Sequence, residues 1–63
     1  METYKLVAND GIEHFLTILE EMNDYYNVTI THRINEYKMV TQNTCNKCLI
    51  EKLLSLGMLK KVS

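Results

Sequence analysis

The chain has no proline and no tryptophan, and only two glycines and two cysteines among its 63 residues. Without a proline-rich or glycine-rich stretch there is no candidate linker, so the sequence predicts one domain over residues 1–63. No apolar run reaches the ~18 residues that a transmembrane helix needs, and the first residues lack the basic-then-apolar pattern of a secretory signal. We therefore expect a cytoplasmic protein, in the host cytoplasm if its source is viral, with no membrane partner.

The two cysteines, Cys45 and Cys48, are too few for a framework of disulfides. A lone Cys-x-x-Cys can be half of a zinc site or a redox pair, but the spacings of His14 and His32 match no common zinc finger. Cysteines at positions i and i+3 on an apolar helix face are typical of buried small side chains. The sequence predicts free, buried thiols with no metal and no cofactor.

The two histidines have no obvious catalytic companions. The sequence shows no paired nucleophile, no glycine-rich phosphate loop and no carboxylate dyad beside His14 or His32. A chain this short also leaves little room for a substrate cavity next to a core. We expect no enzyme activity and no small-molecule substrate.

Charge is unevenly divided along a chain whose net charge is −1. Residues 1–29 hold one lysine against six acidic side chains, a net of −5, and residues 30–63 hold six basic side chains against two acidic ones, a net of +4. This asymmetry lets one end of a nearly neutral molecule attract a polyanion, although solvated surface charges give the same pattern.

Hydrophobic spacing predicts a mainly α fold of three helices. Apolar side chains recur at helical spacing after Asp10, a candidate N-cap, and predict a helix over residues 11–25; they are Ile12, Phe15, Leu16, Leu19 and Met22. Ile30, Ile34 and Tyr37 predict a short second helix over residues 30–38.

The third predicted helix begins after Thr41 as N-cap and ends at Gly57, the usual left-handed terminator. Its inner face would hold the two cysteines and three leucines. Residues 58–62 alternate imperfectly and are expected to form a short strand that pairs with residues 4–8. The expected fold class is a three-helix helix-turn-helix core with a short terminal strand pair.

The stretch from Ile30 to Lys61 resembles winged helix-turn-helix regulators, the MarR-like and related archaeal and viral families. Val40, Thr41 and Thr44 match the apolar residue, cap and threonine that open the recognition helix in those families, and residues 57–59 match the glycine and two apolar residues that begin the wing. The resemblance implies a DNA-binding regulator of transcription. Because the chain ends at Ser63, it implies a truncated wing.

A recognition helix places the side chains at its start on base edges in the major groove, and basic side chains around it hold phosphates. Asparagine and glutamine can pair with adenine and lysine can reach guanine. The expected contacts to double-stranded DNA are Arg33, Lys38, Thr41, Gln42, Asn43, Thr44, Asn46, Lys47, Lys60 and Lys61.

We also expect a homodimer, because so small a core is marginal alone and because helix-turn-helix proteins usually present two reading helices, one per half-site. The first helix or the terminal strand would form the seam.

The alternative function is a small viral or plasmid module that docks on a host protein through an apolar helix face. Tyr25, Tyr26, Tyr37 and Met39 suit such a surface, since aromatic residues and methionine are enriched at interfaces. They suit a core equally well.

Overall fold

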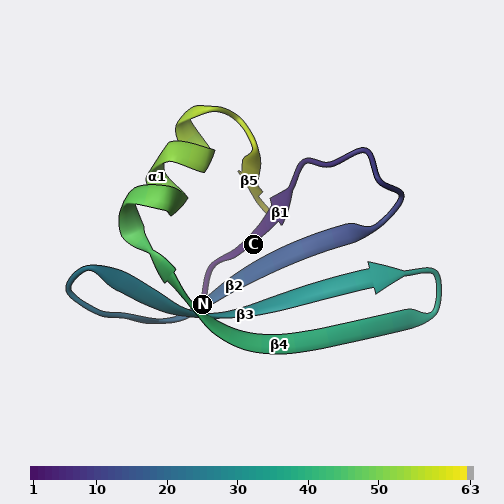
Figure 1. Ribbon diagram of the computed structural model, residues 1–63, viewed down its shortest axis with the longest axis horizontal. Coiled ribbons are helices and arrows are strands. Elements are labelled where there is room, and N and C mark those ends of the chain that lie inside the picture. Colours follow the sequence, from purple (N-terminus) through teal and green to yellow (C-terminus); the bar gives the residue numbers. More distant parts are fainter. Residues whose placement is uncertain (63) are drawn as a thin grey trace.

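The computed structural model describes residues 1–62 and folds them into a five-stranded antiparallel sheet with one helix (Figure 1). The elements, in chain order, are β1 (Thr3–Leu6), β2 (Glu13–Glu21), β3 (Tyr25–Ile34), β4 (Tyr37–Asn46), α1 (Lys47–Ser55) and β5 (Leu59–Lys61). The strands lie in the order β4-β3-β2-β1-β5, so β4 and β5 form the two edges.

The predicted mainly α fold is wrong, and with it the helix-turn-helix and the winged helix. β2 occupies most of the first predicted helix, β3 and β4 take the second, and residues 42–46 of the supposed recognition helix are the end of β4. From residue 27 to residue 31 polar side chains alternate with the apolar β-branched Val28 and Ile30, which is the period of a half-buried strand. The helical spacing of Ile30, Ile34 and Tyr37 was a coincidence.

Other predictions are confirmed. The two terminal segments do pair, as β1 with β5, with Tyr4 opposite Lys61 and Leu6 opposite Leu59. Gly57 does end the helix in a left-handed conformation, with φ of 74°. A helix does lie in the third predicted region, but it is nine residues long and begins at Lys47 rather than after Thr41.

The helix begins late because Asn46, not Thr41, caps it. The Asn46 side chain accepts a hydrogen bond of 2.8 Å from the backbone N–H of Cys48, which satisfies one of the free donors of the first turn. Before this cap, Val40, Thr41 and Thr44 are β-branched and favour the extended backbone of β4. The chain can therefore remain a strand until Asn46 turns it.

The core lies between α1 and one side of the sheet. Tyr4, Ile50 and Leu59 are buried together, and partly buried apolar side chains from β1, β2, β3 and α1 pack against them. Residues opposite one another in adjacent strands share a face, so Tyr4, Leu16 and Ile30 point to this side. We call it the helix side, and the other surface of the sheet the open face.

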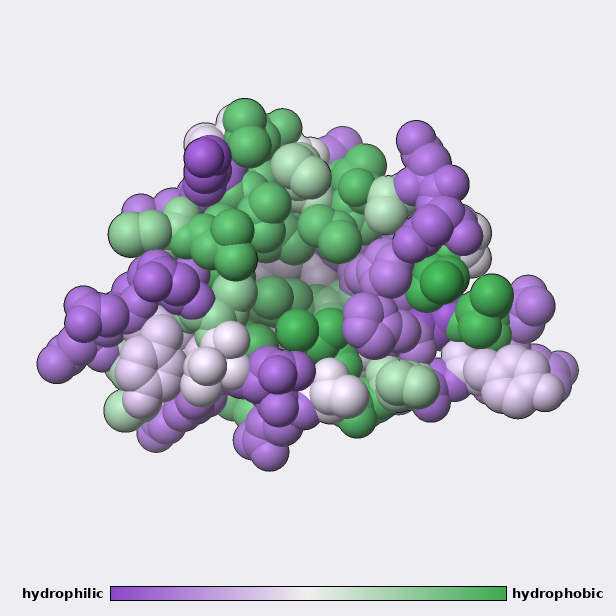
Figure 2. Space-filling view, in the orientation of Figure 1, coloured by the Kyte–Doolittle hydropathy of each residue, from purple (hydrophilic) through white to green (hydrophobic). Residues whose placement is uncertain are grey.

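The helix covers only part of its side. It starts where β4 ends, and the turn that joins β3 to β4 lies at the far end of the sheet (Figure 1). Hydrophobic residues extend from the helix into a hollow at the centre of the view, with hydrophilic residues around the margin (Figure 2). In the described part of the chain, no helix has the length and apolar character to cross a membrane.

Candidate nucleic-acid interface

The open face carries a row of side chains that runs across all five strands. The strand register places Lys60 beside Lys5, Lys5 beside Phe15, Phe15 beside Thr31, and Thr31 beside Val40. Phe15, on the central strand, therefore has two lysines on one side of it. Because no helix of residues 1–62 covers this face, the aromatic ring is only partly buried.

A second row lies next to the first, at the end of the sheet where β3 turns into β4. Here Glu13 of β2 is opposite Arg33 of β3, and Arg33 is opposite Lys38 of β4. Arg33 and Lys38 are both exposed. Together the two rows bring four basic side chains around Phe15 with one acidic side chain among them, and we call this surface the basic rows.

The basic rows are electrostatically open. The ammonium of Lys5 pairs with the Glu13 carboxylate at 3.4 Å and lies 5.9 Å from the centre of the Phe15 ring. Among the described residues, no ion pair involves Arg33, Lys38 or Lys60. Three cations on this face are thus free to meet an anion from solution.

Beside Phe15 the surface is hollowed into a shallow depression of about 520 Å³. Among the residues that line it with the phenyl ring are Thr17, Thr31, Arg33, Glu36 and Lys38. The depression therefore offers an aromatic surface, hydroxyl groups, and two positive charges against one negative charge within one open site.

The predicted DNA contacts do not form one surface. Five of them lie on the open face by register: Arg33, Lys38, Gln42, Thr44 and Lys60. Thr41, Asn43 and Lys61 lie on the helix side, and Asn46 and Lys47 are at the start of α1. The structure thus supports a basic surface, but not the reading helix over residues 42–47.

Several of these side chains have structural partners. Lys47 pairs with Glu21 at 2.7 Å, a hydrogen bond that raises the pKa of the lysine. The Lys61 ammonium lies 3.5 Å from the Glu2 carboxylate, and Asn46 caps the helix. Lys5 and Phe15 were not among the predicted contacts: the expected helix placed Phe15 in the core, and Lys5 lies in the acidic half of the chain. Reading residues 13–18 with period two would have placed Glu13, Phe15 and Thr17 on one face.

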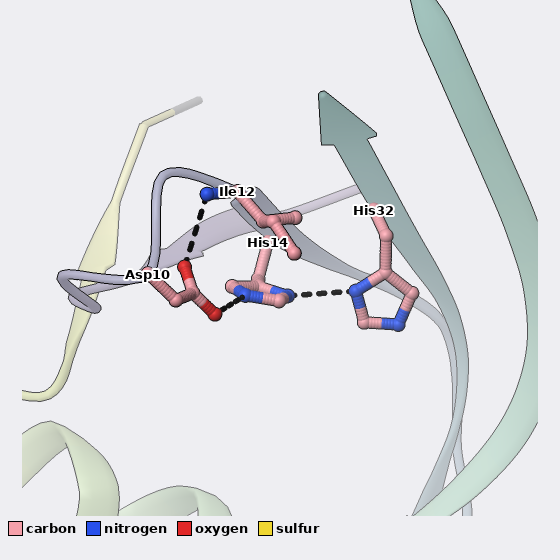
Figure 3. A network of polar contacts seen from close by, with 4 residues as sticks. All are labelled: Asp10, Ile12, His14 and His32. Carbon is pink, nitrogen blue, oxygen red and sulfur yellow. Dashed lines mark hydrogen bonds and ion pairs between the residues drawn. The ribbon is translucent and has the colours of Figure 1, made fainter.

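A polar chain of three side chains closes one end of the helix side (Figure 3). The His14 imidazole lies between Asp10 and His32, with Nε2 2.8 Å from the Asp10 Oδ2 and Nδ1 2.7 Å from the His32 Nδ1. The contact with His14, and a second hydrogen bond that Asp10 accepts from the Ile12 N–H, lower the pKa of the Asp10 carboxyl. Asp10 therefore holds the loop before β2 instead of capping the predicted helix.

The histidine pair borders an apolar groove of about 220 Å³ between α1 and the sheet. Leu16 and Ile30 contribute to the groove from the sheet, and Leu53 contributes from the helix. In the described part of the chain, no group of three or more histidine, cysteine or acidic side chains is placed to hold a metal ion.

Cys45 and Cys48 are free, but the prediction that both are buried is wrong. Cys45 is partly buried, which raises the pKa of its thiol, whereas Cys48 is exposed on α1. The two residues belong to different elements, the end of β4 and the start of the helix, so they do not share one helix face.

Comparison with protein-family models, with curated proteins and with solved structures found no match to this chain.

Proposed function

We propose that the protein binds single-stranded nucleic acid across the open face of its sheet. The observation that carries the proposal is the position of Phe15, in the middle of the sheet with Lys5, Lys60, Arg33 and Lys38 around it. Single strands are bound by positively charged surfaces that follow the backbone and by aromatic rings on which bases stack. The basic rows provide both.

The shape of the face favours a single strand over a duplex. Five strands about 4.8 Å apart span roughly 19 Å, which exceeds the ~12 Å width of the DNA major groove. A single strand can instead lie on the sheet with a base unstacked onto Phe15. This proposal keeps nucleic acid as the partner and replaces the predicted reading helix with a sheet surface.

Most acidic side chains lie away from this surface, although Glu36, in the turn after β3, lines the depression beside Phe15. Glu20, Glu21 and Asp24 lie around the turn between β2 and β3, at the opposite end of β3 from Arg33. Their repulsion would keep a polyanion at the basic end of the open face. The net charge of −1 is therefore compatible with a local site for phosphates.

Binding to fluorescent oligothymidylate and oligouridylate, measured by anisotropy over a range of salt concentrations, tests the proposal. The slope of log K against log salt is about −0.7 per phosphate contact for single strands, so the three free cations predict a slope of roughly −2. Arg33→Gln with Lys38→Gln should reduce the slope by about 1.4. Phe15→Leu should weaken binding about 5-fold or more with little change of slope, since stacking contributes ~1–3 kcal/mol per base.

The matched control is Lys52→Gln, which removes the same charge from an exposed position on α1, on the helix side. It should bind as the wild type does. Absence of binding by the wild type at micromolar protein and ~20 mM salt would refute the proposal. An equal loss in Lys52→Gln and in a Lys38→Gln variant would show nonspecific attraction and refute it too.

A further inference from the structure

The two edges of the sheet differ in how they are protected against pairing with another chain. β5 has three residues, two of them lysines, and a short charged strand is a common way to block an edge. β4 has ten residues with Lys38 as its one charge, no proline, and an unbroken register with β3. A long edge of this kind is a template for another strand.

The register shows which backbone groups of β4 are available. The turn between β3 and β4 has two residues, and the pair that flanks such a turn, Ile34 and Tyr37, exchanges both backbone hydrogen bonds. These pairs alternate along an antiparallel ladder. The backbone N–H and C=O groups of Lys38, Val40, Gln42 and Thr44 therefore point away from β3, to the free edge.

We propose that β4 pairs antiparallel with β4 of a second copy about a twofold axis at Thr41. At the seam, hydrogen-bonded pairs must join residues whose backbone groups point to the free edge. The register that uses all four of these residues places Lys38 opposite Thr44 and Val40 opposite Gln42. In this register the one charge of the strand meets a neutral side chain. The interface is self-complementary, as a closed dimer requires.

Charge at the two ends of β4 favours this orientation. The end at the turn carries Lys38 and Arg33 against Glu36 of the turn, a net charge of +1. At the other end, Glu21 and Asp24 lie beside Lys47, a net charge of −1: the Lys47 ammonium pairs with Glu21, and its backbone N–H donates to the Asp24 carbonyl. An antiparallel pair brings the basic end of each copy to the acidic end of the other, whereas a parallel pair would join like ends.

The same register covers exposed apolar side chains. Tyr37 and Met39 are 78% and 63% exposed on the helix side of β4. Across the seam they lie opposite Cys45 and Asn43 of the second copy, next to the start of its helix. In the joined sheet both outer edges are β5 strands, which are protected against pairing, so no third copy can add to the dimer. This inference does not depend on the proposed nucleic-acid binding.

Charge exchange at Thr41 tests the dimer. Thr41 is exposed, and the proposed axis sets it against itself, so Thr41→Lys alone and Thr41→Glu alone each place like charges opposite one another. By sedimentation at tens of micromolar, without nucleic acid, we expect the wild type at twice its 7.4 kDa and each variant as a folded monomer. An equal mixture of the two variants should recover the dimer.

A second variant and a control complete the test. Gln42→Pro removes an outward N–H and should give a folded monomer by circular dichroism, because edge strands tolerate proline at such positions. Asn9→Lys, in the exposed loop after β1, should remain a dimer. A monomeric wild type, dimers of Thr41→Lys or Thr41→Glu alone, a mixture that stays monomeric, or assemblies larger than two would each overturn the proposal.

Discussion

Tyr4 connects the core to the charged surface at the level of a single residue. Its ring is buried with Ile50 and Leu59, while its hydroxyl donates a hydrogen bond of 2.6 Å to the Glu2 carboxylate. This hydrogen bond, followed by burial, raises the pKa of Tyr4 to about 12 from an ordinary value of 10.0. The hydrogen bond with Tyr4 is also the main cause of the lowered pKa of the Glu2 carboxyl.

The raised pKa of Tyr4 predicts a loss of stability in alkali. The folded state keeps the phenolic proton to higher pH than the unfolded state, so its contribution is complete below about pH 10 and is lost as pH rises toward about 12. Urea unfolding between pH 8 and pH 11 should show a steeper fall for the wild type than for Tyr4→Phe, which keeps the ring. Parallel stability curves would contradict this assignment.

Residue types alone could not distinguish cations available to a ligand from cations already paired. Lys47 and Lys61 were as good candidates in the sequence as Lys38 and Lys60, but the fold sets the first two beside Glu21 and Glu2. These acidic partners are 26 and 59 positions away along the chain. Such pairings depend on the sheet topology, which no local pattern encodes.

At the scale of elements, the sequence contained two competing periods. Ile12, Phe15, Leu16 and Leu19 fit one helical face, yet Phe15 belongs to the open face, opposite to that of Leu16. Antiparallel sheets that pack on one side can carry an apolar residue on the other, and such a residue imitates helical spacing. The sequence of β4 shows no regular alternation of apolar and polar residues, because nearly all of the strand is exposed and neither of its faces has to be apolar.

The turn between β3 and β4 was also missed. Asn35 adopts a positive φ of 53°, which asparagine tolerates better than most residues, but the following residue is Glu36 and not the glycine that marks a typical hairpin turn. By contrast, Gly57 was located correctly, because a glycine after an apolar helix face is a strong local signal.

The start of α1 gives a prediction about stability. Asn46→Ala removes the hydrogen bond to the Cys48 N–H and should lower the free energy of unfolding by about 0.5–2 kcal/mol. Asn9→Ala is the control: Asn9 is exposed in the loop after β1 and its side chain has no hydrogen-bond partner among the described residues, so its change should stay within about 0.5 kcal/mol. Equal unfolding midpoints in denaturant would contradict the capping role.

At the scale of the whole molecule, the sheet separates functions by face and by edge. The helix side buries the small core, the open face presents Phe15 among basic side chains, and β4 leaves an unpaired edge. The charge asymmetry of the sequence is partly kept in the folded protein, because Arg33, Lys38 and Lys60 lie on one face of the sheet. Lys5, from the acidic half of the chain, joins them through the pairing of β1 with β2.

The most direct test of nucleic-acid binding compares the two sides of the sheet in one spectrum. Methyl signals of Thr17, Thr29 and Thr31 report on the open face, and those of Leu16 and Ile30 report on the helix side. On titration of the isotope-labelled protein with oligothymidylate at low salt, we predict shifts at the threonine methyls and the Phe15 ring, with little change at Leu16 and Ile30. Shifts confined to the helix-side methyls, or no shifts at all, would contradict the account.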